Sequence, residues 1–461
     1  MKSPFWQNVS DIFSHLRGRS LVIAIVVWVA LFSISLACAF GAFDFSGKPS
    51  SQTLPTATAQ KPDGMNPTPT VFFALPTPTP EGAVAPTTPE NVVVPTTQSS
   101  APVLPWEFGY GIAADTLSMP SYTLDQVAKQ LKLTWIKQQV RWDHFSPGPG
   151  QMDWSGYDVT VQFANERGLK VMFSIVGAPQ WSRTYFDSNP EAAPPDDYTQ
   201  FVTFLGELVE RYKGRIHAIE VWNEQNLDRE WDTAEGVKAS AYVELLRLSY
   251  QTIKSRDPGI VVISGALSPV GASATDPANP NRVIYVDDFQ YFQQMIDAGF
   301  LNYADCVGAH HNGINMPPDV AWNEGYNDPQ ATFRGPFDNP DHSWSFKSTL
   351  WGYHDMIKAA GRDTPLCVTE FGWATAEGMD GYPPGFEFAL DNSLAEQAEW
   401  DVKAFQLMRE WGFVHLAFLW NLDYANKGGS VTNPNAPYSI IDMNGIARPA
   451  YNAISDMPKI P

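Results

Sequence analysis

IHAIEVWNEQN, residues 216–226, is the segment from which the fold of this chain is best predicted. Ile219 and Val221 suit a buried strand, yet the run passes directly into the polar residues Asn223 and Glu224. Burial of a carboxylate is costly unless the group is paired or hydrogen-bonded. Glu224 therefore needs partners that other parts of the chain must supply.

Seven further apolar runs resemble this segment, and they lie at 108–114, 134–140, 169–177, 260–267, 305–311, 365–372 and 414–420. Between the runs are amphipathic segments, which include 198–213, 235–256, 285–299 and 391–411. Eight strands that alternate with helices predict a parallel sheet closed as a (β/α)8 TIM barrel over residues 106–461. A doubly wound open sheet is the alternative, but no GxGxxG or phosphate loop follows the first run.

Polar residues follow several of these runs, at the strand ends where barrel enzymes place their active groups. Glu224 follows the fourth run, His310 lies in the sixth, Glu370 in the seventh and Trp420 ends the eighth. Two carboxylates in a groove lined by tryptophan are the groups that glycosidic bond cleavage requires. One protonates the leaving oxygen, and the other meets the positive charge that develops at the anomeric carbon.

The motifs EVWNEQN and CVTEFGW, with AFLWNLDY at the eighth run, resemble clan A of the retaining glycoside hydrolases. Within that clan the chain looks most like family 39 and the cellulase-like members of family 5. Supporting segments lie at 142–158, 176–181 and 306–319. The similarity covers essentially all of residues 103–461 and none of the first 102.

This resemblance implies that Glu224 is the acid/base and Glu370 the nucleophile, with the two carboxyls about 5–5.5 Å apart. Asn223 would hydrogen-bond the sugar 2-hydroxyl. We expect the ionised Glu370 to raise the pKa of Glu224, so that Glu224 is protonated near neutral pH. Once Glu370 is glycosylated the repulsion is gone, and Glu224 can serve as the base.

Two further positions follow from the same resemblance. His310 would donate to a sugar hydroxyl or to Glu370, although it can also be a satisfied core histidine. The family has an aromatic residue two positions later, where this chain has Asn312, so the hydrogen bonding of the nucleophile should differ.

In the families that the chain resembles, the second strand commonly offers an arginine at its inner face, five residues before a tryptophan. Counting back from Trp142 gives Lys137 as the candidate, but Gln139 and Arg141 share the same strand face and remain alternatives. Glu220 is expected to be a structural hydrogen-bonding group inside the barrel.

Three tryptophans are candidate sugar platforms. Trp420 is favoured for the subsite at the cleaved bond, whereas Trp181 and Trp373 are weaker candidates that can equally pack beneath loops. Long loops at 268–283 and 312–343 are expected to build the walls of the groove.

The cysteines and histidines give no sign of a cofactor. Three cysteines cannot form a disulfide framework, and no CxxC or His/Cys cluster suggests a metal site. We expect Cys306 and Cys367, each at the start of a predicted strand, to be two buried thiols rather than a disulfide. The predicted enzyme needs neither a metal nor an organic cofactor.

The first 105 residues differ in composition from the rest of the chain. Residues 21–43 contain 23 positions without a charge, which is enough to cross a bilayer. Basic residues within 1–20 would keep that end cytoplasmic. Residues 44–105 are rich in proline and threonine and predict a disordered stalk. The expected localisation is the cell membrane with an extracytoplasmic catalytic domain; secretion after cleavage of a signal is the alternative.

Charge narrows the choice of partners. Residues 1–102 carry equal numbers of basic and acidic residues, so the formal net charge of −20 belongs to the remainder of the chain. Such a surface repels phosphate backbones, so nucleic acid is excluded as a partner. We expect a monomeric catalytic domain that acts on a polysaccharide or oligosaccharide. A surface carbohydrate-binding or scaffold protein without turnover, and a transglycosylase, are the alternative functions.

Overall fold

Eight parallel strands form the centre of the fold in the computed structural model, which describes residues 107–185 and 192–460. Each predicted apolar run overlaps one strand. The strands are β1 (Gly109–Ala113), β2 (Trp135–Arg141), β3 (Lys170–Val176), β4 (Ala218–Val221), β5 (Val261–Ser264), β8 (Val307–Gly313), β9 (Leu366–Trp373) and β10 (Val414–Leu419). Their order in the sheet is β5-β4-β3-β2-β1-β10-β9-β8.

The two edge strands, β5 and β8, meet and nearly close the sheet into a barrel. The Ser264 amide donates to the Cys306 carbonyl oxygen at 3.1 Å, and the Asp305 amide donates to the Val262 carbonyl oxygen at 2.8 Å. Gly308 lies in this seam, where a Cβ atom would come within 2.0 Å of a backbone oxygen of β5. The arrangement is consistent with a (β/α)8 barrel and not with an open doubly wound sheet.

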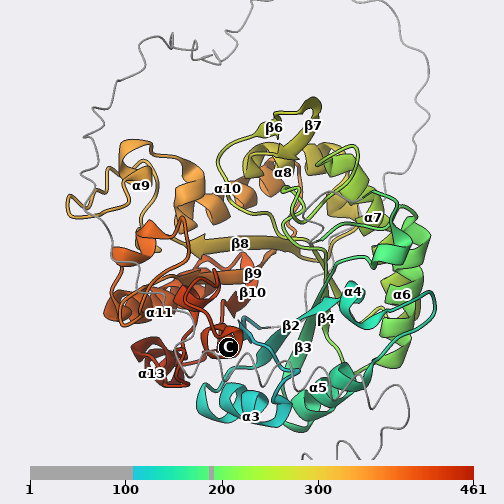
Figure 1. Cartoon of the computed structure of the whole chain (residues 1–461), viewed down its shortest axis with the longest axis horizontal. Helices are drawn as coiled ribbons and strands as arrows, with labels where there is room; N and C mark the ends of the chain where they lie inside the picture. The colour runs from blue at the N-terminus through green and yellow to red at the C-terminus, as the bar shows by residue number, and fades with distance from the viewer. Residues whose placement is uncertain (1–106, 186–191, 461) are drawn as a thin grey trace, which may run out of the picture. The chain divides into compact units, whose positions relative to one another are not determined.

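Helices surround the strands, as Figure 1 shows. The long ones are α5 (Ser155–Glu166), α6 (Tyr198–Arg211), α7 (Ala239–Arg256), α8 (Asp288–Asp297), α10 (Phe346–Ala359), α11 (Leu394–Trp411) and α13 (Pro449–Asp456). The short ones are α3 (Pro120–Asp125), α4 (Trp142–Phe145), α9 (Gly335–Asp338) and α12 (Tyr424–Gly428).

Local sequence explains where the helices begin and end, and α11 is an example. Ser393 accepts from the Glu396 amide at 3.1 Å while the Glu396 side chain accepts from the Ser393 amide at 2.8 Å. This capping box satisfies two amides that a helix start leaves unpaired. The helix ends at Gly412, whose φ of 71° is left-handed and favours glycine.

The expectations for the first 105 residues are not tested by the structure, whereas the expectation of a loop at 268–283 is. The predicted membrane segment 21–43 and stalk 44–105 lie outside the described residues. Across 107–185 and 192–460, no helix combines the length and the apolar character needed to cross a membrane. The expected loop at 268–283 is partly wrong, because β6 (Ala274–Asp276) and β7 (Asn279–Tyr285) pair there as an antiparallel hairpin.

The interior of the barrel is layered. Residues two apart on a strand face the same side of the sheet, so the side chains that point inward form successive layers along the barrel. Here one layer is apolar and the next is polar. The apolar layer consists of Trp135, Met172, Ala218, Val261, Ile263, Cys306, Cys367, Leu416 and Phe418. The neighbouring polar layer begins two residues further along β2, β3 and β4, with Lys137, Ser174 and Glu220, all buried.

Cys306 and Cys367 form a disulfide inside the apolar layer, so the expectation of two free thiols is wrong. The reason is strand register: β8 and β9 pair side by side, with Gly308 opposite Cys367. The two Cα atoms are 5.8 Å apart, within the range that a disulfide spans. The pairing of β8 with β9 and their register arise from the closed barrel, and they cannot be predicted from the spacing of the two cysteines in the sequence.

Loss of this disulfide should destabilise the barrel. We expect the double variant Cys306→Ala/Cys367→Ala to lose about 2–4 kcal/mol of unfolding free energy, because the bond restricts the unfolded chain. Urea denaturation followed by tryptophan fluorescence measures the change. Cys38→Ala is the control, since it removes a cysteine without removing this bond. Equal stability of the double variant and the wild type would contradict the prediction.

Candidate active site

The chain turns sharply after β4, and this turn presents Asn223 and Glu224. Trp222 and Glu224 have φ angles of 78° and 42°, a region that residues other than glycine rarely occupy. Such conformations cost about 1–3 kcal/mol each and persist only where the surroundings enforce them. Here the Trp222 amide donates to Ile175 at 3.0 Å and the Glu224 amide donates to Ala266 at 2.8 Å.

A bulge in β9 presents the second carboxylate. Ala309 of β8 pairs with Val368, and the next residue, His310, pairs with Glu370. Thr369 is therefore an extra residue in β9. A bulge redirects side chains, so Thr369 and Glu370 both reach polar groups of the barrel interior although they are consecutive in sequence.

Glu224 and Glu370 line one cavity of about 380 Å³ at the carboxyl ends of the strands, together with Gln139, Asn223, Asn312 and Trp420. The imidazole ring of His310 lies between the two carboxylates. Its Nδ1 is 3.3 Å from Glu224 Oε1, and its Nε2 is 3.7 Å from Glu370 Oε1. The structure therefore brings together the two acids that the sequence places 146 positions apart.

Lys137 holds Glu370 from inside the barrel. Its Nζ lies 2.9 Å from Glu370 Oε1 and 3.3 Å from Glu220 Oε2, and all three side chains are buried. Burial opposes the charge of Lys137, but the attraction of the two carboxylates outweighs it and raises the lysine pKa. The same attraction lowers the pKa of Glu220 against the effect of burial.

Of the three alternatives on β2, Lys137 is thus the basic residue that reaches the nucleophile candidate. Gln139 lines the cavity, whereas Arg141 is partly exposed and donates to Asp143 at 3.2 Å. Asn312, at the position where the family has an aromatic residue, donates to Glu370 Oε2 at 3.5 Å. Glu220 accepts from Thr369 Oγ1 at 2.6 Å, as expected of a structural group.

The electrostatics of Glu224 differ from expectation. Burial raises its pKa, but the hydrogen bond with His310 and the nearby charge of Arg229 prevail and lower it from 4.5 to about 2. Arg229 Nη2 lies 2.6 Å from Glu224 Oε2. The expectation that Glu224 has a raised pKa and is protonated near neutral pH is therefore wrong for this structure, because two donors contact Glu224 directly.

The histidine and the amide next to the acids have distinct surroundings. His310 is fully buried, so it contacts carboxylates rather than a sugar hydroxyl. Burial lowers the pKa of His310, but the negative charge of Glu370 and the hydrogen bond with Glu224 raise it by more, so the pKa is raised overall. Asn223 lines the cavity, and its buried Oδ1 has no hydrogen-bond partner among the described residues.

The three candidate tryptophans separate clearly. Trp420 is partly exposed and lines the cavity. Trp181 instead donates to the Ser146 carbonyl oxygen at 3.0 Å and packs edge-on against Trp142. Trp373 is buried and donates to the Met316 carbonyl oxygen at 2.8 Å. Neither Trp181 nor Trp373 is among the residues that line the cavity, so the structure does not bring them to the site.

Several residues of the cavity escaped the sequence analysis. Phe386 and Tyr438 add aromatic surface from the long segments that follow β9 and β10. Arg229 and Glu230 come from the turn after β4. The one signal in the sequence that could have found Arg229 and Glu230 is that they lie close to Glu224 along the chain. Burial, and then the charge of Glu224, raises the pKa of Glu230 from 4.5 to about 8.

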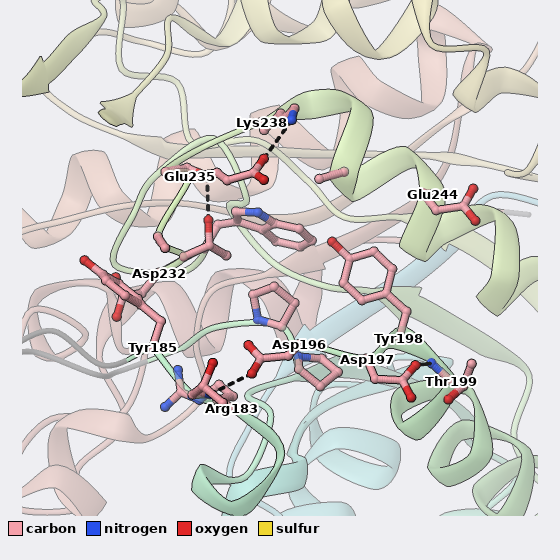
Figure 2. Close-up of a pocket in the computed structure, with 18 of the residues that line it drawn as sticks. Arg183, Tyr185, Asp196, Asp197, Tyr198, Thr199, Asp232, Glu235, Lys238 and Glu244 are labelled. Atoms are coloured by element: carbon pink, nitrogen blue, oxygen red, sulfur yellow. Dashed lines mark hydrogen bonds and ion pairs between the residues drawn. The ribbon is translucent and has the colours of Figure 1, made fainter. Parts of the chain in front are cut away.

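A larger cleft of about 630 Å³ lies between the segments that follow β3 and β4. Figure 2 shows Arg183, Tyr185, Tyr198 and Asp232 around it. It contains neither Glu224 nor Glu370. Across the described residues no cluster of histidine, cysteine and acidic side chains is suited to hold a metal ion.

The fold and this pair of acids are those expected of a clan A glycoside hydrolase. The model of glycosyl hydrolase family 10 matches residues 103–258. This match supports the resemblance to clan A and the enzyme class that it implies, a glycosidase. The matching model is family 10, whereas the sequence motifs look most like families 39 and 5.

Solved structures share the barrel. A family 39 glycoside hydrolase from Bacteroides cellulosilyticus WH2 has a TM-score of 0.53 and 17% identity, covering 75% of this chain and 62% of its own. A monomeric beta-xylosidase from Caulobacter crescentus CB15 has a TM-score of 0.50 and 17% identity, with coverages of 76% and 67%. A glucosidase from Croceicoccus marinus has a TM-score of 0.51 and 13% identity, with coverages of 76% and 66%. At these identities the likeness shows the fold, and this chain spans less than two thirds of the Bacteroides protein.

Proposed function

We propose that the protein is a retaining glycoside hydrolase that cleaves O-glycosidic bonds of a β-linked polysaccharide or oligosaccharide. The observation that carries this proposal is the placement of Glu224 and Glu370 on one cavity, with the His310 ring between them. A protein that only binds carbohydrate has no use for two facing carboxylates. The neighbouring Trp420 offers the apolar face on which a sugar ring can stack.

In the first step a carboxylate oxygen of Glu370 attacks the anomeric carbon, and the bond to the leaving oxygen breaks. Lys137 and Asn312 orient the attacking group through contacts of 2.9 and 3.5 Å. Glu224 must carry a proton at this stage, although His310 and Arg229 lower its pKa in this structure. It gives that proton to the leaving oxygen, so the aglycone departs as an alcohol. The product of this step is a glycosyl ester on Glu370.

In the second step a water molecule attacks the same anomeric carbon. Glu224, now a carboxylate, takes the proton from this water, and the ester bond to Glu370 breaks. Two inversions restore the original anomeric configuration. Asn223 Oδ1 is free to accept from a sugar hydroxyl throughout, because no described side chain or backbone group bonds it.

We also propose that the catalytic domain works outside the cytoplasm. The buried disulfide between Cys306 and Cys367 supports this location, because such bonds form and persist in oxidising compartments. The apolar run at 21–43 would then serve as the membrane anchor.

Product stereochemistry tests the proposed reaction. The full-length chain is incubated with a panel of β-linked glycans, and the anomeric protons are followed by NMR from the first minutes. Retention predicts that the β anomer forms first. The α anomer as first product would refute the mechanism. Activity that depends on a sugar acceptor would favour transglycosylation, and equal behaviour of wild type and Glu370→Ala on every glycan would favour a binding protein.

The role of Glu224 predicts a dependence on the leaving group. For a glycoside with a poor leaving group, we expect Glu224→Gln to lower kcat/KM about 10²- to 10⁴-fold, the range of general acid catalysis. For a dinitrophenyl glycoside, whose leaving group departs without a proton, the loss should be far smaller. Glu207→Gln, an exposed position on α6, is the control. Equal losses for both substrates would contradict the assignment of Glu224 as the acid.

A further inference from the structure

A separate cleft lies on the loop that follows β8, around the short helix α9 (Figure 1). This α9 cleft has a volume of about 510 Å³, and none of the described residues that line it also lines the catalytic cavity. Two large aromatic side chains stand at its surface, because Trp322 is 40% exposed and Tyr326 is 38% exposed. Single exposed aromatics are common on proteins, but two in one cleft indicate a binding surface.

Arg334 fixes the polar groups of the α9 cleft. Its Nη2 donates to Asn327 Oδ1 at 2.8 Å and to Asp338 Oδ1 at 3.0 Å, and its guanidinium lies 4.9 Å from the centre of the Phe337 ring. Among the described residues that line the cleft, Arg334 and Asp338 are the charged ones, so their charges cancel. Aromatic faces with fixed donors and acceptors and no net charge suit a neutral ligand that carries many hydroxyls.

The loop that carries the α9 cleft is anchored to the barrel by helix α10. Ser345, the residue that caps the start of α10, donates its hydroxyl to the Val320 carbonyl oxygen at 2.6 Å. The Trp322 amide donates to the hydroxyl of Ser348, one turn further along, at 3.1 Å. Trp322 is therefore held at the surface by its backbone, so the cleft is formed before any ligand binds and little ordering is needed on binding.

A row of aromatic rings joins the catalytic cavity to this loop. Phe386 lines the cavity, and its ring centre is 5.0 Å from that of Phe388. The Phe388 ring centre is 5.8 Å from that of Phe333, which is 5.9 Å from that of Trp344. The Trp344 indole donates to the carbonyl oxygen of Asn339 at 3.1 Å, at the end of α9. Four rings in contact thus connect the cavity with the loop around the α9 cleft.

Asp391 fixes the position of this row of rings. Its carboxylate accepts from the amides of Thr332 and Phe333 at 2.6 and 2.9 Å, and from Asn315 Nδ2 at 2.8 Å. Those three residues belong to the loop that follows β8, whereas Asp391 belongs to the segment after β9, which also supplies Phe386. The two loops are therefore tied to each other, and the α9 cleft keeps a defined position relative to the catalytic cavity.

We propose that the α9 cleft binds a second stretch of the neutral polysaccharide chain whose bonds are cleaved in the catalytic cavity. The inference rests on the proposed hydrolase function and deepens it, because it selects a polysaccharide rather than a short oligosaccharide as the substrate. Trp322 and Tyr326 stack on the C–H faces of sugar rings, and Asn323 bonds their hydroxyls. No bond is made or broken in the cleft. It holds the chain close to the cavity and so raises the local concentration of cleavable bonds.

The dependence of activity on substrate length tests this proposal. The full-length double variant Trp322→Ala/Tyr326→Ala lacks both stacking faces. Its kcat/KM is measured on soluble xylan, β-glucan and galactomannan, and on aryl glycosides of the same sugars, which are too short to reach the cleft. For the polysaccharide that the wild type cleaves, the ratio of polysaccharide to aryl glycoside kcat/KM should fall at least about 10-fold, because a chain held at two sites binds more tightly than a chain held at one.

A control variant and a binding measurement accompany the rates. Tyr122→Ala removes an exposed aromatic side chain of α3, outside the cleft, and should leave the ratio unchanged. Binding is measured without turnover in the Glu370→Gln background, by the retardation of the protein in native gels that contain the same polysaccharide. Adding Trp322→Ala/Tyr326→Ala should raise the Kd at least about 10-fold, whereas adding Tyr122→Ala should not change it.

An unchanged ratio or an unchanged Kd in the double variant would overturn the proposal. An equal loss of kcat/KM on the polysaccharide and on the aryl glycoside would also overturn it, because the loop would then act on the structure of the cavity rather than as a second binding site. If the wild type cleaves no glycan, the proposed function fails and this inference fails with it. An active wild type with an unaltered double variant contradicts this inference alone.

Discussion

Replacing Glu370 by glutamine is expected to lower kcat/KM by roughly 10⁴- to 10⁶-fold, the scale seen when a catalytic nucleophile is removed. Glutamine has nearly the same shape as glutamate but cannot form the glycosyl ester. Lys137 would keep Glu220 as its partner at 3.3 Å, so the barrel should remain folded. Initial rates on a cleaved β-glycan measure the loss, and far-UV circular dichroism checks the fold.

The controls for this variant are specific. Glu399→Gln changes an exposed acid on α11 and should retain full activity. A 2-deoxy-2-fluoro β-glycoside, which slows the hydrolysis of the ester, should label the wild type once, on the peptide that contains Glu370. Label on another residue, or more than a tenth of the activity in Glu370→Gln, would show that Glu370 is not the nucleophile.

Replacing Lys137 by methionine should produce the largest loss of stability. The variant removes the ammonium that Glu220 and Glu370 share and leaves two buried carboxylates without it. Breaking a buried ion pair in this way costs about 3–5 kcal/mol. Urea denaturation should show the decrease, and activity should fall as well because Glu370 loses the group that orients it.

Two comparisons make the Lys137 experiment decisive. Lys129→Met removes a lysine with 66% of its side chain exposed, whose ion pair with Asp125 lies on the surface. Such pairs contribute about 0–1 kcal/mol, so this control should change little. The double variant Lys137→Met/Glu220→Gln should recover part of the stability, since one unpaired charge is gone. A Lys137→Met protein as stable as the wild type would disprove the role of this buried pair.

The strands could be predicted because their signal is local. Runs such as 216–222 and 365–372 are apolar and short. The first is followed by Asn223 and Glu224, and the second contains Thr369 and Glu370, polar residues that a buried strand would not otherwise carry. Once the barrel is assumed, the carboxyl ends of the strands must converge, so Glu224 and Glu370 can be placed together. The resemblance to clan A added the separate roles that we propose for them.

Contacts between elements could not be predicted in the same way. The disulfide depends on the register of β8 against β9, and the reach of Glu370 depends on the bulge at Thr369. The pKa of Glu224 depends on Arg229, whose side chain returns from the following turn to contact it. The sequence does not show whether a tryptophan is exposed. Trp373 was therefore a candidate sugar platform, although its side chain lies in the core.

The sharing of Lys137 has a consequence for the course of the reaction. One ammonium contacts two carboxylates, those of Glu220 and Glu370. In the proposed mechanism, formation of the ester at Glu370 would remove one of these two negative charges and leave Lys137 with Glu220. The same change would remove a carboxylate that raises the pKa of His310, so formation of the intermediate would alter the charge around both basic groups.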